Sequence, residues 1–387
     1  MEALFTPIDI GNLKLKNRIV MPAMHLNYTP DGEVTDKLIA FYEERAKGGA
    51  ALIIVGGCAV DEYGGYLNMI GISDDRFIPG LKRLTDVVHR HGALIASQLF
   101  HGGRYIHSSF IGRSPVAPSP IASGLTREEP REMTIEDIKY TTDSFARAAE
   151  RAKEAGFDAV EIIGSAGYLI TQFLSPITNK RTDEYGGSFE NRMRFGLEVA
   201  GAVRNAVGKD FTVLIRLGGN DFMPGGNTNR EIRLFAAELE KCGIDAFDIT
   251  GGWHESRVPQ ITMGVPRGGY TYLARGVKKV VSKPVISCNR INDPFLADKI
   301  IREGSADMAG FARGLIADPE MPNKARNGRL NEITPCIGCN QGCLDNVFVM
   351  KPIECMVNPR AGRELDAPPI SKTETPKKVM VIGGGPG

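Results

Sequence analysis

Short apolar runs rich in β-branched residues occur eight times in the first 315 residues, and a longer segment with helical spacing follows each of them. Apolar runs without polar alternation are typical of strands that are buried on both faces, as in a parallel sheet covered by helices. Eight strand–helix pairs with short connections predict an α/β fold, a closed (β/α)₈ TIM barrel. An open, doubly wound sheet remains the alternative, because strand number alone does not reveal closure. The runs occupy residues 18–24, 51–57, 93–100, 158–165, 211–218, 246–252, 283–290 and 307–313.

The segments between these runs carry signals for helix ends. Several of them finish in Gly just before the next run, as the C-termini of helices prefer. Thr134 with Asp137, and Ser188 with Asn191, provide possible N-cap positions. Helices are therefore expected within residues 35–49, 78–92, 134–156, 190–208, 229–243, 272–281, 293–304 and 318–328.

A barrel of this kind places its functional residues at the C-terminal ends of the strands. Arg290 and Arg313 end the last two runs, where they could clamp a phosphate, although surface salt bridges are an equally open interpretation. Arg216 ends a buried run, where an unpaired charge is costly, so we expect an anion or an electron-rich cofactor ring beside it. The segment 101–124, rich in Pro, Gly and Ser, is expected to form a lid over the mouth.

Tyr168 and His254 follow the fourth and sixth runs. A tyrosine with an ordinary pKa of about 10 can donate a proton to a developing carbanion, and a histidine beside it can stabilise an enolate. Each could equally be a satisfied residue at the rim of the mouth. His25, His101 and His254 end three different runs, so a zinc-dependent lyase or hydrolase is a more distant alternative. No Asp or Glu at the strand ends completes that ligand set.

Four closely spaced cysteines follow the last helical segment. Structural zinc usually has two pairs of cysteines with a long gap, whereas three clustered cysteines and a distant fourth are more typical of a [4Fe–4S] cluster. Disulfides are rare in a reducing cytosol, so the pattern favours the iron–sulfur cluster, with zinc still open. The four are Cys336, Cys339, Cys343 and Cys355, while Cys58, Cys242 and Cys288 are expected to be inert core residues.

Charge and hydropathy limit the partners of the chain. Lys and Arg number 47 against 46 Asp and Glu, a net charge of +1, so neither nucleic acid nor an anionic membrane surface is an expected partner. The N-terminus lacks the features of a signal peptide and no run of 18 apolar residues occurs, which predicts a cytoplasmic protein. The expected organisation is a barrel over 1–330, a cysteine segment over 331–365 and a linker over 366–378. The last stretch, VMVIGGGPG (379–387), resembles the first strand and turn of a dinucleotide-binding domain, so we expect the natural protein to continue.

Four motifs in one order carry a resemblance that spans essentially the whole chain. They are LKNRIVMPAM (15–24), QLFHGGR (98–104), the long stretch from GYLITQF to ENRMRF (167–195), and CIGCNQGC (336–343) with CMVNPR (355–360). Together they resemble the Old Yellow Enzyme family, and within it the 2,4-dienoyl-CoA reductase branch.

The resemblance implies an FMN-containing barrel, a [4Fe–4S] cluster beside it, and a following domain for FAD and a nicotinamide. Electrons would pass from NAD(P)H through FAD and the cluster to FMN. A hydride from FMN N5 would then reduce an activated C=C bond, with Tyr168 as proton donor and His254 as its partner. The substrate would be an enoyl or dienoyl thioester or an enone. Oxo-steroids of the bile-acid type, flavonoids and tetrapyrroles are alternatives on the same scaffold, and the choice between NADH and NADPH stays open.

The resemblance also assigns residues. Apart from these assignments, His25 is a candidate substrate contact, and Lys180 and Arg181 are candidate basic contacts for a CoA thioester. Cys336, Cys339, Cys343 and Cys355 match the cluster ligands, and FMN should be non-covalent because no cysteine lies near the first run. The residues assigned to FMN are Pro22, Ala23, Met24 and Gly57 around the ring, Gln98 and Arg216 at its pyrimidine side, and Arg290, Ala312 and Arg313 at the phosphate.

Overall fold

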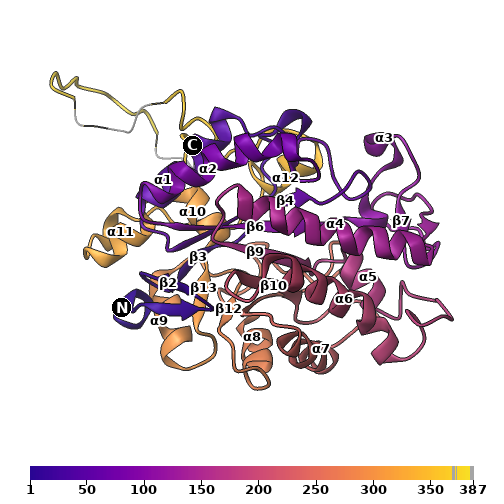
Figure 1. The fold of residues 1–387 in the computed structure, drawn as a ribbon. Helices are drawn as coiled ribbons and strands as arrows, with labels where there is room; N and C mark the ends of the chain where they lie inside the picture. Colours follow the sequence, from indigo (N-terminus) through magenta and orange to yellow (C-terminus); the bar gives the residue numbers. More distant parts are fainter. Residues whose placement is uncertain (368–370, 372, 384–387) are drawn as a thin grey trace.

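A closed barrel of eight parallel strands forms the centre of the protein, as seen in a computed structural model that describes residues 1–367, 371 and 373–383 (Figure 1). The first barrel strand pairs with both the second and the last, which closes the cylinder and excludes the open sheet. The predicted TIM barrel is therefore confirmed, and each predicted run contains one strand. The barrel strands are β3 (Ile19–Met21), β4 (Leu52–Ala59), β6 (Leu94–Phe100), β9 (Ala159–Gly164), β10 (Thr212–Gly218), β11 (Ala246–Thr250), β12 (Val285–Ser287) and β13 (Met308–Gly310).

Helices surround the strands in Figure 1, and all eight predicted helical segments contain one. Thr134 and Asp137 form a reciprocal capping box, and Ser188 accepts a hydrogen bond from the Asn191 N–H at 3.2 Å. Both predicted N-caps are thus confirmed. The outer helices are α1 (Asp36–Lys47), α2 (Ile78–His89), α4 (Ile135–Glu154), α6 (Phe189–Val207), α7 (Asn229–Lys241), α8 (Thr271–Lys278), α9 (Pro294–Arg302) and α11 (Met321–Arg326).

Two short helices follow barrel strands directly and were not predicted. They are α5 (Leu169–Leu174) after β9 and α10 (Ala312–Ala317) after β13. All six residues of α5 are buried, so the segment lacks the alternation of polar and apolar faces by which a surface helix is recognised. Both helices lie at the end of the barrel that carries the functional residues.

The opposite end of the barrel is closed by an antiparallel hairpin of β1 (Ile8–Ile10) and β2 (Leu13–Leu15). Ile10 and Leu15 are buried in one apolar cluster with inward-facing strand residues such as Leu214 and Met308. The interior is therefore filled by side chains up to the C-terminal ends of the strands, where space remains for a ligand.

The predicted lid lies between β6 and α4. It contains a 3₁₀ turn (Gly103–Tyr105), the short helix α3 (Ser108–Ile111), and a strand β7 (Val116–Ala117) that pairs with β8 (Arg131–Glu132). Other small elements are β5 (Ile70–Gly71), beside β4, and 3₁₀ turns at Ala3–Phe5, Pro30–Gly32, Asp75–Phe77 and Leu330–Glu332.

The cysteine segment packs against the barrel near α1 and contains the helix α12 (Leu344–Phe348). Tyr28 donates its hydroxyl hydrogen to the Ile353 carbonyl at 2.7 Å, and a buried ion pair joins Arg45 to Glu364 at 2.5 Å. The segment is therefore an integral part of the barrel unit.

Beyond this segment, residues 373–383 contain no strand. Val379, Met380, Val381 and Ile382 expose more than four fifths of their surface. Residues 384–387 of the predicted nucleotide-binding turn lie outside the described residues. Assignment of this stretch to a further domain stays a prediction. None of the helices in the described residues combines the length and apolar character that crossing a membrane requires.

Candidate active site

A cavity of about 540 Å³ opens at the C-terminal end of the barrel. Residues at or just beyond the ends of all eight barrel strands line it, which is where a TIM barrel carries its active site. Tyr168, His254 and His25 also face it. The structure brings together here every residue that the resemblance assigned to FMN, namely Pro22, Ala23, Met24, Gly57, Gln98, Arg216, Arg290, Ala312 and Arg313.

The floor of the cavity contains charged residues that the strand pattern did not reveal. Gln98 donates from Nε2 to Glu161 Oε1 at 2.6 Å, and Arg216 Nε lies 3.6 Å from Asp248 Oδ2. The sequence predicted an anion or an electron-rich ring beside Arg216, and the Asp248 carboxylate is such an anion. A signal was present, because Glu161 and Asp248 are carboxylates within otherwise apolar strands.

The two arginines at the end of β12 and β13 lie at the other side of the cavity. Among the described residues, neither Arg290 nor Arg313 forms an ion pair with a carboxylate, so the surface salt bridges considered above are not found. Arg290 donates from Nε to the Val265 carbonyl at 3.1 Å, and Arg313 donates from Nη2 to the Ile261 carbonyl at 2.7 Å. Burial and the neighbouring Arg313 both lower the pKa of Arg290. Two adjacent cations without a counter-charge fit a phosphate group.

Tyr168 and His254 form a pair above the floor. The Tyr168 hydroxyl lies 2.7 Å from His254 Nε2, and the tyrosine ring packs edge-on against Phe100 with their centroids 4.5 Å apart. Burial raises the pKa of Tyr168, so its phenol is neutral at neutral pH. The side chain of His254 is exposed to the cavity, and partial desolvation by the surrounding protein lowers its pKa, so the imidazole is neutral as well. A neutral phenol held by a neutral imidazole has a proton available for donation.

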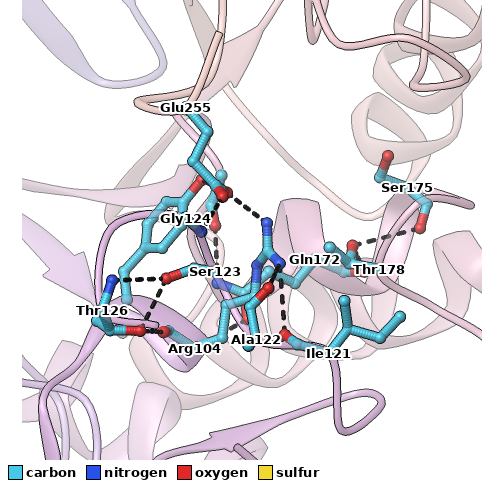
Figure 2. A network of polar contacts seen from close by, with 12 residues as sticks. Arg104, Ile121, Ala122, Ser123, Gly124, Thr126, Gln172, Ser175, Thr178 and Glu255 are labelled. Atoms are coloured by element: carbon cyan, nitrogen blue, oxygen red, sulfur yellow. Dashed lines mark hydrogen bonds and ion pairs between the residues drawn. The ribbon is translucent and has the colours of Figure 1, made fainter. Parts of the chain in front are cut away.

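A polar latch made of Arg104, Tyr105 and Glu255 joins the lid to the loop of His254. Figure 2 shows Arg104 and Glu255 directed toward each other. Arg104 pairs with Glu255 and donates to the Ala122 carbonyl at 3.0 Å, while the Tyr105 hydroxyl donates to Glu255 at 2.7 Å. The Gly124 N–H also donates to Glu255. The ion pair of the latch could not be predicted from the sequence, because Arg104 and Glu255 are 151 positions apart.

The three histidines considered for zinc do not form a common site. His101 is buried away from the cavity lining, and its Nδ1 accepts the Gly103 N–H at 3.0 Å. Throughout the chain as far as it is described, no three His, Cys, Asp or Glu side chains converge on a position for a single metal ion. The proposed histidine ligand set is therefore wrong.

The four predicted cluster cysteines surround one small cavity of about 20 Å³, together with Arg313 and Asn340. Burial raises the pKa of the Cys355 thiol, and the N–H groups of Val357 and Asn358 directed at its sulfur act in the opposite sense. An iron–sulfur cluster carries its irons at separate corners, so its thiolates stand further apart than the ligands of one ion, and backbone N–H groups commonly face its sulfurs. Four thiols around one cavity fit such a group.

Lys180 and Arg181 do not line the active-site cavity. Lys180 is exposed and donates to the Pro176 carbonyl. Arg181 donates to the Met133 carbonyl at 2.6 Å and pairs with Asp183, so it holds the base of the lid. His25 alone of the three predicted substrate contacts faces the cavity.

Residues 3–332 match the family described as NADH:flavin oxidoreductase / NADH oxidase. The chain belongs to this family. Membership implies FMN as the bound flavin and confirms the resemblance inferred from the motifs.

Two curated relatives show the range of names within the family. A "Metal reductase" of Desulforamulus reducens is 59% identical over 385 residues, covering 100% of this chain and 58% of the relative. A "Cinnamate reductase" of Clostridium sporogenes is 36% identical over 420 residues, covering 99% of this chain and 61% of the relative. The solved structure of a 2-naphthoyl-CoA reductase in complex with 2-naphthoyl-CoA superimposes with a TM-score of 0.92 at 39% identity, over 94% of this chain and 58% of that one. The chain thus spans about three fifths of the length of these proteins.

Proposed function

We propose that this flavin oxidoreductase reduces an activated C=C bond conjugated to a carbonyl group. The observation that carries the proposal is the Tyr168–His254 pair, 2.7 Å apart, facing a cavity whose other walls suit FMN. Relatives named for cinnamate and for 2-naphthoyl-CoA support it, because both compounds are unsaturated and conjugated to a carboxyl or thioester group.

The residues present fit FMN at both ends. Arg290 and Arg313 would bind its phosphate, while Gln98 and Arg216 would contact the pyrimidine side of the ring. When bound, FMN would supply the hydride for the electron-poor carbon. Tyr168 would protonate the other end of the double bond from its hydroxyl.

With Nε2 protonated, the neutral His254 would donate to the Tyr168 oxygen and so direct the hydroxyl hydrogen toward the substrate. After the transfer, Tyr168 would regain its proton from solvent. The lid, held by the Arg104–Glu255 latch, would exclude water from the pair. The aromatic lining of the cavity, which includes Tyr66, Phe100 and Phe110, favours a flat apolar substrate.

Cys336, Cys339, Cys343 and Cys355 would hold a [4Fe–4S] cluster that supplies single electrons. Cys336 and Cys343 line both the small cysteine cavity and the large cavity, so the two proposed cofactor sites adjoin. The supply of electrons from NAD(P)H through FAD, which the resemblance implies, is part of the same proposal.

The test is anaerobic purification, followed by the absorption spectrum and by analysis of iron and zinc. Dithionite-reduced protein is then mixed with cinnamate, an aryl-CoA thioester, an oxo-steroid, a flavonoid and a tetrapyrrole. We expect flavin and iron in the protein, and reoxidation by at least one of the conjugated alkenes. A colourless protein, or a flavoprotein that no alkene reoxidises, would refute the proposal.

A second candidate is one-electron reduction of a metal ion as substrate. The relative named metal reductase favours it, and the four cysteines are partly exposed rather than enclosed. Ferric citrate is the probe for this activity. If ferric citrate still reoxidises the reduced Tyr168→Phe variant while alkene reduction is lost, the protein transfers electrons to the metal ion and to the alkene at two separate sites.

A further inference from the structure

Two carboxylates lie under the floor of the active-site cavity, and the mechanism above uses neither. Glu161 of β9 and Asp248 of β11 are both completely buried. Arg216 of β10 stands between them, directly opposite Asp248 in the strand register, and Gln98 of β6 is directly opposite Glu161. Four neighbouring strands therefore bring two acids and one base to the same layer of the barrel.

Each carboxylate has a partner for only one of its oxygens. Glu161 Oε1 accepts from Gln98 at 2.6 Å, and Asp248 Oδ1 accepts from the Cys288 thiol at 2.8 Å. Within the described residues, Glu161 Oε2 and Asp248 Oδ2 are buried without a hydrogen bond, although Arg216 Nε is 3.6 Å from the latter. A buried carboxylate oxygen without a hydrogen-bond donor is unfavourable. These two oxygens therefore need a hydrogen atom that the positions of the carbon, nitrogen, oxygen and sulfur atoms do not reveal.

Charge balance points to a proton. Two carboxylates against one guanidinium leave one net negative charge in the barrel interior, which is expensive in a medium of low dielectric constant. The groups that face Glu161 are Gln98 of β6, Arg216 of β10, Asp248 of β11 and Cys288 of β12. Burial, and then the neighbouring Asp248, raise the pKa of Glu161 to about 8, while Arg216 acts in the opposite direction.

Geometry assigns the proton to Glu161 rather than to Asp248. Asp248 is the carboxylate opposite the Arg216 guanidinium, and it already accepts from Cys288. In the described part of the chain, Glu161 has only the neutral Gln98 amide as a hydrogen-bond donor. The acid that lacks a charged donor is the one that retains a proton.

We propose that Glu161 carries a proton at neutral pH, and that this single proton sets the charge of the floor on which FMN rests. With the proton, Arg216 and Asp248 balance and the floor is neutral. Without it, the floor is negative and opposes the negative charge that a flavin gains when it is reduced. Glu161 reaches FMN only through Gln98, so it is a positioning residue that tunes the midpoint potential. This inference rests on the proposed FMN site.

The first test is the pH dependence of the FMN midpoint potential in the wild-type protein and in Glu161→Gln. Glutamine keeps an oxygen that accepts from Gln98 but cannot titrate. In the wild type we expect one additional proton to be taken up per two electrons at pH values above about 8, where Glu161 is ionised in the oxidised protein. In Glu161→Gln this additional proton uptake should disappear, whereas Glu154→Gln on the exposed surface of α4 should behave like the wild type. Equal pH profiles in wild type and Glu161→Gln would overturn the inference.

A second test does not need FMN. Infrared spectra of the apoprotein should contain the C=O stretching band of a buried carboxylic acid that titrates away in alkaline solution. The band should be lost in Glu161→Gln and kept in Glu154→Gln. Absence of the band from the wild type, or its loss in Asp248→Asn but not in Glu161→Gln, would refute the assignment even if a variant folds poorly. Failure of the wild type to bind FMN would instead refute the proposed function, which keeps the two outcomes distinct.

Discussion

Replacing Tyr168 by phenylalanine removes one oxygen atom and leaves the rest of the site in place. The ring is held by Phe100, at a centroid distance of 4.5 Å, and by Tyr105 at 6.0 Å, and these contacts do not involve the hydroxyl. Among the residues that the structure describes, the hydroxyl has one partner, His254 Nε2, at 2.7 Å. Loss of one neutral hydrogen bond should lower the free energy of unfolding by only about 1 kcal/mol.

The effect on catalysis should be much larger than the effect on stability. If Tyr168 donates the proton, its loss should slow alkene reduction by roughly 10²- to 10⁴-fold, the usual contribution of general acid catalysis. This corresponds to about 3–5 kcal/mol in the activation free energy. The small stability loss leaves the protein folded, so the change in rate reports the loss of proton transfer. Binding of FMN should be unchanged.

The assay is single-turnover reoxidation of the dithionite-reduced protein by an alkene, followed by flavin absorbance. Tyr66→Phe is a matched control, since Tyr66 lines the same cavity but lies beside His25 rather than His254. We expect Tyr66→Phe to react within a few-fold of the wild type. Full activity of Tyr168→Phe, or an equal loss in both variants, would refute the assignment of the proton donor.

Three further predictions address the latch, the cluster and the buried acid. Glu255→Gln leaves the buried Arg104 guanidinium without its counter-charge, so urea unfolding should show a loss of about 3–5 kcal/mol and limited proteolysis should cut the lid faster; unchanged values would mean that the latch is not structural. Cys355→Ser should lose iron in elemental analysis while retaining FMN, and retention of full iron content would remove Cys355 from the cluster ligands. The folded state raises the pKa of Glu161 from 4.5 to about 8. Protonation of Glu161 therefore stabilises the folded state fully below pH 4.5, and this stabilisation is lost as the pH rises to about 8. The free energy of unfolding should fall by about 1.4 kcal/mol per pH unit in this range. Urea unfolding of the apoprotein should therefore show a shallower decline in this range for Glu161→Gln, and parallel curves would contradict the raised pKa.

The helices and strands could be predicted because the pattern of apolar residues in each element indicates which of its faces are buried. A strand covered on both faces must be apolar throughout, and a helix on the outside must be apolar on one side, so all eight pairs were visible as patterns. The helix α5 was missed for the same reason, since it is buried on every side and shows no pattern.

Much of the candidate site could also be placed from sequence. Once the strands are known, the barrel brings their C-terminal ends together, and this alone gathers Gln98, Arg216, Arg290 and Arg313 around one cavity. No motif supported the candidate substrate contacts Lys180 and Arg181, and the fold directs Arg181 to the lid base instead. Sequence distance is a poor guide where a loop returns on itself.

The order of apolar and polar residues by itself determined that eight buried strands alternate with helices and that four cysteines follow them. The pairing of β3 with both β4 and β13 decided that the sheet closes into a barrel. Only the tertiary structure decided which charges meet. Glu161 contacts Gln98 63 positions away, and Arg104 contacts Glu255 151 positions away. Burial follows from local composition, whereas pairing of charges depends on the register of strands and on the path of the lid. That register sets how protons and charges are balanced under the cavity.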